Sequence, residues 1–467
     1  MTPFDVVTRS YQFPTYIKPH ALQLECINEL SALNNSGEWL DMGTGKTFVS
    51  TACALFHKVT YGNVCVVIVP PLLISQWARW LRSITPALSV VEYKGTPTER
   101  KLKTLDADFV IVGVQIFKKE FAKFDNWYSL RQYSVIVDEA TMVSNVSSDN
   151  HSKVFDFSIG RPTMLLSGTP ANKPSDAYGL LKFTAPGTYR SIGQFENLHI
   201  EERDFWGAPV KYRGLDELAE NLLINSKRVL FQDMYPMSEE PVFIPLNYDL
   251  EPTHLKLYRK LAEEQLLALP DGGKIDGTTA ARLRHLLGQI VVNKGHFTGK
   301  PDDRSFATDL IEQRLMESGE KLVVFANYRM TVAHIASRLS KYKPGIINGD
   351  VTASQKEKSI QRFINDSDCR LIVIQFISGG KGLDGLQHVC NQALFIEPCV
   401  QPRDFHQCVA RLNRMGQKRR VAVTLAIANG TVQVRQFKNL LINDGITNEV
   451  IRNATDLRKS IFGDADD

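Results

Sequence analysis

Short apolar runs rich in β-branched residues recur along the chain and alternate with stretches of helical periodicity. Four runs lie in the first half of the chain and five in the second, at residues 64–70, 108–113, 134–140, 163–170, 321–327, 344–349, 370–376, 392–398 and 421–427. Continuous apolar strands that alternate with helices are typical of parallel sheets covered on both faces. The pattern therefore predicts two α/β domains in tandem.

The segment between the two series of strands has the periodicity of helices. One helix is expected from residue 250 to the turn at residues 270–273, and a second over residues 279–295. The sequence therefore predicts a first lobe at residues 1–235, a hinge with helical insertion at 236–300, and a second lobe at 301–467. Residues 201–214 contain two short β-prone pieces and are expected to form a hairpin insertion in the first lobe.

Composition and charge narrow the class of protein only slightly. The 467 residues are 43% hydrophobic and 23% charged, which is ordinary for globular proteins, and the net charge of +4 permits a nucleic-acid partner without requiring one. The seven cysteines form no CxxC pair and mostly lie in or near apolar runs, which indicates a reduced compartment. Because no signal peptide or long apolar span is evident, a soluble intracellular protein is expected.

Residues 40–47, LDMGTGKT, have the pattern of a phosphate-binding loop in its short GxGKT form, with Leu40 where the strict motif has glycine. Glycines let backbone N–H groups approach phosphate oxygens, and a helix expected to begin at Phe48 adds its dipole. Lys46 is expected to reach the β- and γ-phosphates, and Thr47 to ligate Mg²⁺. The alternative is a glycine turn without a ligand. The loop residues are Gly43, Thr44, Gly45, Lys46 and Thr47.

Two adjacent carboxylates, Asp138 and Glu139, end the apolar run that begins at residue 134. A phosphate-binding loop needs such a carboxylate on a neighbouring strand. Asp138 is expected to hold Mg²⁺, and Glu139 to orient and deprotonate the attacking water. The alternative is that both acids only solubilise a strand end, and the upstream GxGKT loop favours the catalytic interpretation.

The segment LSGTP at residues 166–170 closes another apolar run. Ser167, Gly168 and Thr169 are expected to sense the nucleotide and to couple its state to the rest of the sheet. The alternative is an ordinary turn, because glycine and proline form one without any ligand.

In the segment HQCVARLNRMGQKRR, at residues 406–420, helical spacing predicts that Gln407, Arg411 and Arg414 share one helix face. Gly416 is expected to end this helix in a left-handed cap. A basic helix face is most often a solvated one. The upstream phosphate loop instead offers these arginines a phosphate to contact, with Gln407 as their partner in sensing it.

Taken together, the motifs resemble helicase superfamily two, and within it the Swi/Snf-type DNA translocases, from about residue 17 to residue 440. The matching segments are IKPHALQLECINEL, MGTGKT, VVIVPPLLISQW, DEATMVSN, LSGTPANKPSDAYGLLKFTAP, LVVFANY, ISGGKGLDGLQ, HQCVARLNRMGQ and NGTVQVRQF. The resemblance implies two RecA-like lobes with ATP between them. It also implies that Gln23 reads adenine and that Gly382 and Gln407 contribute to the nucleotide site.

The sequence departs from the family pattern at four places. Thr141 replaces a histidine, Asp384-Gly385 replaces a single asparagine, Leu40 replaces a small residue, and Lys356 replaces an arginine. The substitution at Thr141 puts the coupling between the nucleotide and LSGTP in question. Lys46, Asp138, Glu139, Arg411 and Arg414 are all present, so an active Mg²⁺-dependent ATPase is expected. Arg411 and Arg414 would stabilise charge on the γ-phosphoryl group.

Nucleic-acid contacts are expected from loops, mostly to phosphates and without sequence preference. The candidates are Ser75, Gln76, Gln115, Trp206, Arg329, Gly349 and Ser378. The aromatic and basic hairpin around Trp206 could wedge a DNA junction. The alternatives are that the loop residues only cap turns and that the hairpin aromatics pack onto the first lobe.

The function expected from the resemblance is an ATP-driven translocase on double-stranded or branched DNA, active in fork remodelling or branch migration. Its compactness resembles bacteriophage-encoded motors, and the expected form is a monomer in the cytoplasm of a bacterial host, with no membrane partner. Two alternatives stay open: a strand-separating DNA or RNA helicase, and a nucleotide-switched module that moves a protein partner.

Overall fold

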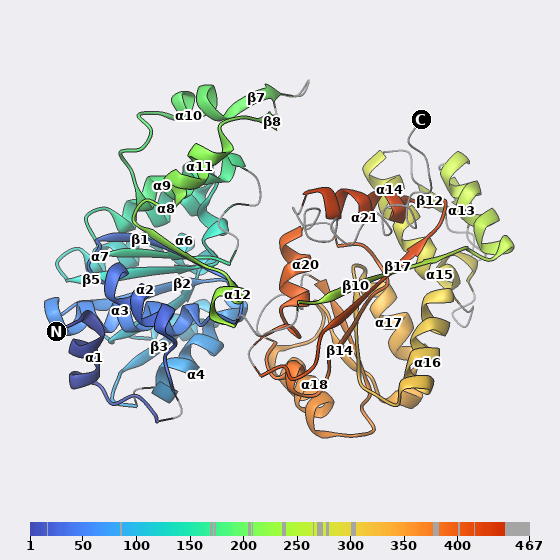
Figure 1. The fold of residues 1–467 in the computed structure, drawn as a ribbon, viewed down its shortest axis with the longest axis horizontal. Coiled ribbons are helices and arrows are strands. Elements are labelled where there is room, and N and C mark those ends of the chain that lie inside the picture. The colour runs from blue at the N-terminus through green and yellow to red at the C-terminus, as the bar shows by residue number, and fades with distance from the viewer. Residues whose placement is uncertain are drawn as a thin grey trace. The chain divides into compact units, whose positions relative to one another are not determined.

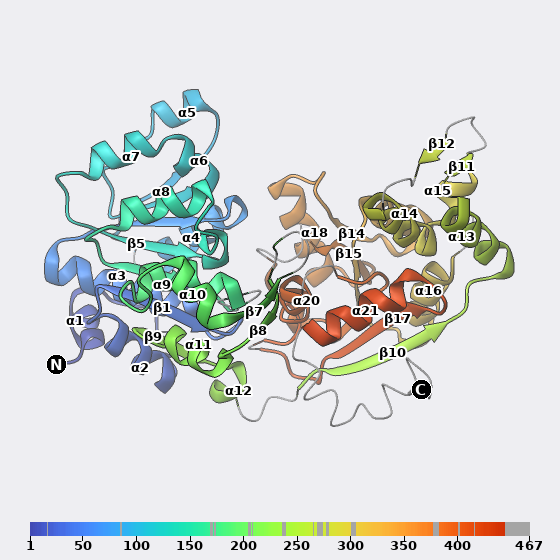
Figure 2. The same ribbon diagram turned by 90° about the horizontal axis from the view of Figure 1, so that it is seen from above.

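The fold is that of a computed structural model. The residues that it describes, called the described residues below, are 1–15, 17–84, 86–168, 171, 174–203, 207, 209–235, 240–264, 266–268, 274–276, 280–299, 305–376, 383–399, 402–414 and 416–443. The chain divides into two compact units, unit 1 (Met1–Met237) and unit 2 (Ser238–Asp467). Each unit is an α/β layer structure of its own (Figures 1 and 2). The predicted fold class, two α/β lobes built on parallel sheets, is confirmed.

Unit 1 is built on a seven-stranded sheet in which all pairs are parallel, in the order β3-β4-β2-β5-β6-β1-β9. Its strands are β1 (Asn35–Leu40), β2 (Val64–Val69), β3 (Val90–Tyr93), β4 (Phe109–Gly113), β5 (Tyr133–Asp138), β6 (Thr163–Leu166) and β9 (Ser226–Val229). The strands β7 (Ile200–Arg203) and β8 (Pro209–Tyr212) form the predicted hairpin as an antiparallel pair.

Helices cover both faces of the unit 1 sheet, because successive strand residues point to opposite faces and both sets are apolar. The first face packs on α1 (Pro3–Ser10), α2 (Ala21–Leu30), α3 (Lys46–Tyr61) and α4 (Ile74–Ile84). The second packs on α6 (Val114–Lys119), α7 (Phe121–Tyr128), α8 (Asp149–Ser158) and α9 (Ala177–Thr184). The remaining helices of the unit are α5 (Pro97–Lys101), α10 (Ile192–His199), α11 (Leu215–Leu222) and α12 (Phe231–Met234), with short 3₁₀ turns η1 (Pro71–Leu73), η2 (Ala140–Val143) and η3 (Pro174–Asp176).

Unit 2 is built on a six-stranded parallel sheet in the order β10-β17-β16-β13-β15-β14. Its strands are β10 (Val242–Tyr248), β13 (Leu322–Ala326), β14 (Gly345–Ile347), β15 (Leu371–Gln375), β16 (Gln392–Phe395) and β17 (Ala422–Ala428). A small antiparallel pair is formed by β11 (Leu266–Ala268) and β12 (Lys274–Asp276).

Helices lie on both sides of the unit 2 sheet (Figure 2), and two apolar clusters join them to it. One includes α13 (Pro252–Glu264), α14 (Ala280–Val292), α15 (Lys294–Thr298), α16 (Phe306–Ser318) and α17 (Arg329–Arg338). The other includes α18 (Ala353–Asn365), α20 (Pro402–Val409) and α21 (Val432–Asn443). Short 3₁₀ turns are η4 (Ser340–Tyr342) and η5 (Leu386–His388).

The structure corrects two expectations about residues 236–300. Strand β10 pairs along its whole length with β17, so this part of the predicted hinge belongs to the unit 2 sheet. The helix expected to continue to residue 270 ends at Glu264, and Leu266–Ala268 pairs with Lys274–Asp276 instead. The backbone groups of residues 266–268 thus bond to a partner strand and not to a preceding helical turn. Residues 279–295 match α14 and the start of α15.

The cysteine and hydropathy patterns have structural counterparts. All seven cysteines, each within the described ranges, are buried free thiols. Among the helices that the structure describes, none is long and apolar enough to cross a bilayer.

Candidate nucleotide site

The three motifs of unit 1 lie at one edge of its sheet. The phosphate-loop sequence follows β1, Asp138 ends β5, and Ser167 follows β6. These strands are neighbours in the order β5-β6-β1, and Leu166 is opposite both Asp138 and Glu38 in register. Ligands of open parallel sheets bind at this carboxyl edge, so the topology brings together the residues that the sequence singled out.

The glycine loop has a backbone shape that only glycine adopts easily. Gly43 has φ of 81° and Gly45 has φ of 88°, and a Cβ atom on Gly45 would lie 2.3 Å from Nε2 of Gln23. Gln23 Nε2 donates to the Thr44 carbonyl at 2.8 Å, and its Oε1 accepts from the His20 amide at 2.9 Å. Gln23, predicted to read adenine, therefore also holds the loop.

Lys46 is the first residue of α3, two positions earlier than the expected start at Phe48. Its Nζ donates to the carbonyls of Leu40 at 2.7 Å and Asp41 at 3.0 Å. Burial lowers the pKa of Lys46 to about 8, while the nearby Asp138 acts in the opposite direction. The ammonium group is thus held beside the loop by hydrogen bonds to backbone carbonyls. A phosphate oxygen can replace these carbonyls as its partner.

Asp138 and Glu139, the two acids of the DEA segment (residues 138–140), differ in backbone conformation. Asp138 Oδ2 accepts a hydrogen bond of 2.8 Å from the indole Nε1 of Trp77, and Oδ1 accepts one of 2.9 Å from the Glu139 amide. Glu139 has φ of 59°, a left-handed backbone that is uncommon for a residue with a side chain. Such strain is concentrated at functional sites, and it turns the chain sharply at the end of β5.

The LSGTP segment packs directly on the phosphate loop. The buried Ser167 donates its amide to the Glu38 carbonyl at 3.1 Å. A Cβ atom on Gly168 would lie 3.6 Å from both Lys46 Nζ and the Leu40 carbonyl oxygen. Gly168 therefore lies close to Lys46 and Leu40, and its coupling role stays a prediction. Thr169, the third predicted coupling residue, lies outside the described residues.

Arg228, on β9, is a residue that sequence reasoning did not assign to the site. Its Nη1 donates to the carbonyls of Trp39 at 2.8 Å and Gly168 at 2.9 Å, and its Nη2 pairs with Asp41 Oδ1 at 2.7 Å. Asp41 Oδ2 also accepts from the Phe231 amide at 3.1 Å. One guanidinium thus ties β1, the phosphate loop and LSGTP together. A single arginine near a strand end carries no sequence signal that could have identified it.

Glu38 is a second residue that sequence reasoning missed. It is fully buried on β1, and neither carboxylate oxygen has a hydrogen-bond partner in the described part of the chain. Burial raises the pKa of Glu38 well above its usual value, while the neighbouring Lys46 opposes the shift. The signal was an acidic residue between Gly37 and Trp39, directly before a phosphate loop. Burial thus favours the neutral form of this carboxyl group behind the loop.

In unit 2 the predicted helix containing three site residues is wrong. Helix α20 ends at Val409, and the following amides make short-range bonds, such as Arg411 N to the Cys408 carbonyl at 3.1 Å. Arg411 Nη1 donates to the Leu383 carbonyl at 3.2 Å, and Arg414 Nη1 pairs with Asp384 Oδ1 at 3.2 Å. The arginines are thus oriented by residues 383–384 rather than by a helix face.

The neighbouring cations also affect Arg411 electrostatically. Burial, followed by the charge of Arg414, lowers the pKa of Arg411 to about 10, a value that still leaves it charged at neutral pH. Burial and the charge of Arg411 lower the pKa of Lys356 to about 8. Gln407 is buried on α20, whereas Gly382 lies outside the described residues. Three cationic side chains near one another favour an anionic ligand.

Gly416 and Gln417, which end the segment that carries Arg411 and Arg414, contact the loop before β16. Gly416 has the expected left-handed backbone, with φ of 93°, but it does not cap the helix, because α20 already ends at Val409; a Cβ atom on Gly416 would lie 2.6 Å from Cε1 of His388. Gln417 Nε2 donates to the carbonyls of Cys390 at 2.9 Å and Leu412 at 3.2 Å. These contacts explain why glycine and glutamine occur together at this place.

A sequence model of the SNF2-related domain matches residues 39–293, which is more than half of the chain. The chain belongs to the SNF2-related family. A helicase conserved C-terminal domain model matches residues 305–416 of this SNF2-related chain. The Swi/Snf-type resemblance within superfamily two is thereby confirmed at the level of the family.

Individual relatives are distant. The chain is 22% identical to the Chromodomain-helicase-DNA-binding protein 1 of Gallus gallus over 84% of its own length and 24% of that protein. It is 22% identical to the DNA annealing helicase and endonuclease ZRANB3 of Mus musculus, over 84% of this chain and 37% of that one. This SNF2-related chain therefore spans well under half of these relatives. A solved structure, the Sulfolobus solfataricus SWI2/SNF2 ATPase core in complex with dsDNA, is similar at 19% identity and a TM-score of 0.44, over 97% of this chain and 93% of that one.

The unit 1 site of this SNF2-related chain fits ATP and Mg²⁺ chemically. Gly43 and Gly45 leave the loop backbone open to phosphate oxygens, and Lys46 supplies a cation beside it. Thr47 and Asp138 would supply oxygen ligands to the metal. Among the described residues no group of three His, Cys, Asp or Glu side chains could hold a metal. Mg²⁺ takes one or two protein oxygens and completes its shell with phosphates and water, so a hydroxyl and a carboxylate would suffice to hold it.

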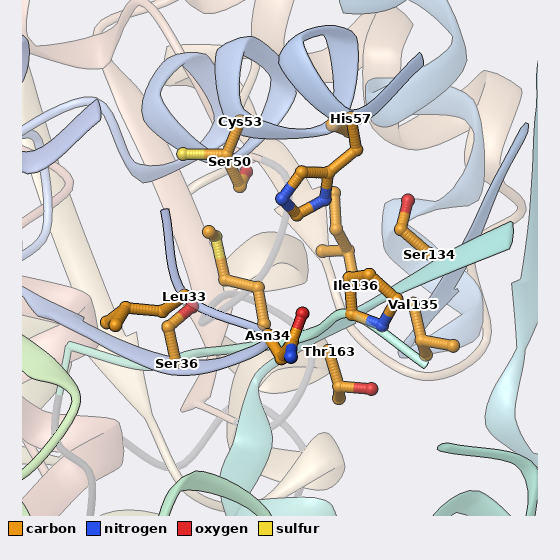
Figure 3. Close-up of a pocket in the computed structure, with 13 residues that line it drawn as sticks. Leu33, Asn34, Ser36, Ser50, Cys53, His57, Ser134, Val135, Ile136 and Thr163 are labelled. Carbon is orange, nitrogen blue, oxygen red and sulfur yellow. The ribbon is translucent and has the colours of Figure 1, made fainter. Parts of the chain in front are cut away.

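A cavity elsewhere in unit 1 is too small for a ligand. It has a volume of about 10 Å³ and lies between α3 and the amino-terminal ends of β1, β5 and β6, lined by residues that include Cys53, His57 and Thr163 (Figure 3). Such a volume holds about one water molecule. It is at the end of the strands away from the phosphate loop and has no part in the site.

The predicted nucleic-acid contacts have varied surroundings. Ser75 Oγ donates to Glu92 at 3.1 Å and accepts from Lys94 at 2.6 Å, and Arg329 pairs with Asp350. A carboxylate thus lies beside each of these two candidates. Gln76, Gln115 and Gly349 are exposed, whereas Trp206 and Ser378 lie outside the described residues.

The hairpin's basic side chains are engaged in ion pairs. Lys211 contacts Glu201 at 2.6 Å, and Arg203 contacts Glu196 of α10 at 2.9 Å. Tyr212 donates its hydroxyl to Ser175 at 3.3 Å. These contacts favour the packing role of the hairpin over a free basic surface, while the wedge role of Trp206 stays a prediction.

Glu397 of unit 2 links its sheet to the start of α17 and is expected to make stability depend on pH. It is fully buried, and its carboxylate accepts from the amides of Asn327 at 2.6 Å and Tyr328 at 3.1 Å and from the Thr331 hydroxyl at 2.6 Å. Burial raises the pKa of Glu397 to about 7 despite these donors. A raised pKa contributes stability that is fully present below the unfolded pKa of about 4.5 and is lost as pH rises towards 7.

We therefore expect Glu397→Gln, which keeps a neutral side chain of the same shape, to remove this loss of stability. The difference between the wild type and this variant should change by on the order of 3 kcal/mol between pH 4.5 and pH 7. Urea unfolding followed by far-UV circular dichroism measures it. All five tryptophans lie in unit 1, so fluorescence reports on that unit and should not change. Equal pH profiles for wild type and variant would contradict the assignment; Glu320→Gln, at the surface, is the control.

Proposed function

We propose that this chain is an ATP-driven motor that moves along double-stranded or branched DNA, as in fork remodelling or branch migration. The observation that carries the proposal is that each unit by itself gathers a set of residues suited to phosphoryl transfer. Unit 1 gathers Lys46, Asp138 and Glu139 at one sheet edge, and unit 2 orients Arg411 and Arg414 through residues 383–384. The mouse relative, whose name is DNA annealing helicase and endonuclease ZRANB3, supports an action on DNA structures.

In the proposed reaction, the loop amides and Lys46 would bind the phosphates of ATP, and Thr47 and Asp138 would hold Mg²⁺, which would neutralise charge on the phosphate oxygens. Glu139 orients the attacking water and accepts its proton. Arg411 and Arg414 stabilise the charge that develops on the γ-phosphoryl group. Because these arginines belong to the other unit, hydrolysis requires the two units to approach, and this couples chemistry to stepping along DNA.

The test is ATP hydrolysis measured with linear duplex, forked duplex, four-way and single-stranded DNA, at more than one salt concentration. We expect duplex or branched DNA to stimulate hydrolysis several-fold and Lys46→Ala to remove hydrolysis on every substrate. The matched control is Lys58→Ala at the other end of α3, where the half-buried lysine pairs with Asp108 and not with the phosphate loop; it should hydrolyse ATP as the wild type does.

Two outcomes would favour other functions. If no DNA raised hydrolysis, the motor would be excluded and a nucleotide-switched module would be favoured. If a linear duplex with a single-stranded tail were unwound faster than forks or junctions, a strand-separating helicase would be favoured. The bacteriophage origin, the host-cytoplasmic location and the monomeric state stay predictions.

A further inference from the structure

The indole of Trp77 contacts the carboxylate that is assigned to Mg²⁺. Trp77 lies on α4, is 2% exposed, and donates its Nε1–H to Asp138 Oδ2 at 2.8 Å. The other oxygen, Oδ1, accepts from the Glu139 amide at 2.9 Å. Both carboxylate oxygens therefore have a protein donor that fixes the plane of the group.

The position of the indole is set by packing and not by the carboxylate alone. Trp77 belongs to the apolar cluster that includes residues of α3, α4 and the sheet. Helix α4 follows β2 through η1, and β2 pairs with β5, the strand that Asp138 ends. The ring is thus held rigidly beside the end of β5, and its single N–H donor is aimed at one carboxylate oxygen.

A rigidly held N–H donor selects one orientation of the carboxylate over the others. Asp138 is, after burial itself, the largest electrostatic influence on the ammonium of Lys46. Without the indole, Oδ2 would lose this hydrogen bond and could turn towards that cation, while the Glu139 amide would still hold Oδ1. Donors that hold a metal-ligating carboxylate typically change metal affinity by about 10- to 100-fold.

We propose that Trp77 is a positioning residue, which fixes the carboxylate of Asp138 so that nucleotide and Mg²⁺ bind together. The inference rests on the proposed function, in which Asp138 is a Mg²⁺ ligand. It assigns the tryptophan of the PPLLISQW segment a role at the metal through its N–H group, in addition to its role in the core.

The chain offers a matched control on the same helix. Trp80, three residues further along α4, donates its indole N–H to the Thr51 hydroxyl at 3.2 Å on α3. Trp77→Phe and Trp80→Phe each remove one indole donor from α4 and leave an aromatic ring. Only the first variant removes a donor from a carboxylate.

The experiment measures binding of a non-hydrolysable ATP analogue by titration calorimetry, with MgCl₂ and with EDTA. We expect Trp77→Phe to weaken Mg²⁺-dependent binding about 10-fold or more and to leave binding in EDTA unchanged. Trp80→Phe should keep the wild-type ratio of the two affinities. In the Asp138→Asn background, Trp77→Phe should have no further effect, because its partner is no longer a charged ligand.

Equal Mg²⁺ dependence in Trp77→Phe and Trp80→Phe would overturn the inference and leave the proposed function intact. If the wild type bound the nucleotide equally tightly in MgCl₂ and in EDTA, both the inference and the proposed function, in which Asp138 is a Mg²⁺ ligand, would be contradicted. If Trp77→Phe failed to fold, benzothienylalanine at position 77 would carry the test, because it keeps the fused ring and replaces N–H by sulfur. The same loss of Mg²⁺-dependent binding is expected there.

Discussion

Replacing Arg414 with alanine is expected to lower DNA-stimulated ATP hydrolysis by about 10³- to 10⁵-fold while ATP still binds. The structure orients Arg414 through Asp384 at 3.2 Å, beside Arg411, whose guanidinium contacts the Leu383 carbonyl. Both arginines are supplied by unit 2, whereas the phosphate loop belongs to unit 1. Nucleotide affinity should therefore change little, because the loss falls on the charge that develops during phosphoryl transfer.

Arg419→Ala is the matched control for this prediction. Arg419 lies five residues further along the chain and pairs with Glu320 at the surface of unit 2. The Arg419→Ala variant should hydrolyse ATP at nearly the wild-type rate, because an exposed ion pair contributes little to stability. Arg419 also lies outside the motifs. Normal turnover in Arg414→Ala, measured by phosphate release at saturating ATP and DNA, would show that this arginine has no role at the phosphate.

Replacing Gly179 with alanine is expected to destabilise unit 1 by about 1–3 kcal/mol or more. A Cβ atom on Gly179 would lie 1.8 Å from the Ser144 carbonyl oxygen, so the backbone of one element has to shift. Gly179 is on α9, after LSGTP, and Ser144 directly follows η2, after the DEA segment. The change should therefore also weaken the coupling between the two motifs. Urea unfolding followed by tryptophan fluorescence measures the stability of this unit.

Gly193→Ala provides the comparison, because Gly193 is also a helical glycine of unit 1. It is exposed on α10, and the nearest atom to a Cβ there, Ser191 Oγ, is at an ordinary 3.7 Å. Alanine favours helix over glycine, so this variant should be as stable as the wild type or up to about 1 kcal/mol more stable. If Gly179→Ala were equally harmless, the contact between α9 and the end of η2 would not be as tight as the structure shows.

Much of the fold followed from local pattern. Each apolar run predicted as a strand overlaps a strand of one of the two parallel sheets, because buried parallel strands must be apolar on both faces. Strand β1 was missed as a strand, since Asn35-Ser36-Gly37-Glu38 is polar although most of it is buried. Its place between β6 and β9 supplies the pairing that local sequence does not contain.

Some parts of the site were predicted correctly from the sequence and others were not. The physical reason differs between these parts. The glycines of the phosphate loop and the acids of DEA need particular backbone or charge properties, and few other residues can replace them. The helix expected over Arg411 and Arg414 was wrong, because contacts with Leu383 and Asp384 replaced regular helical geometry beyond Val409. Spacing along a chain cannot reveal a partner that is distant in sequence.

The sequence by itself determined which groups are candidates for catalysis, namely a phosphate loop, two acids and two arginines, in a chain of the SNF2-related family. The tertiary structure alone decided how these groups are held. Trp77 meets Asp138 from 61 residues away, Arg228 reaches Asp41 from 187 residues away, and Glu38 is buried without a partner in the described part of the chain. Residue type dictates what a side chain can do, but only the packing of strands and helices brings a donor to its acceptor and removes the water between them.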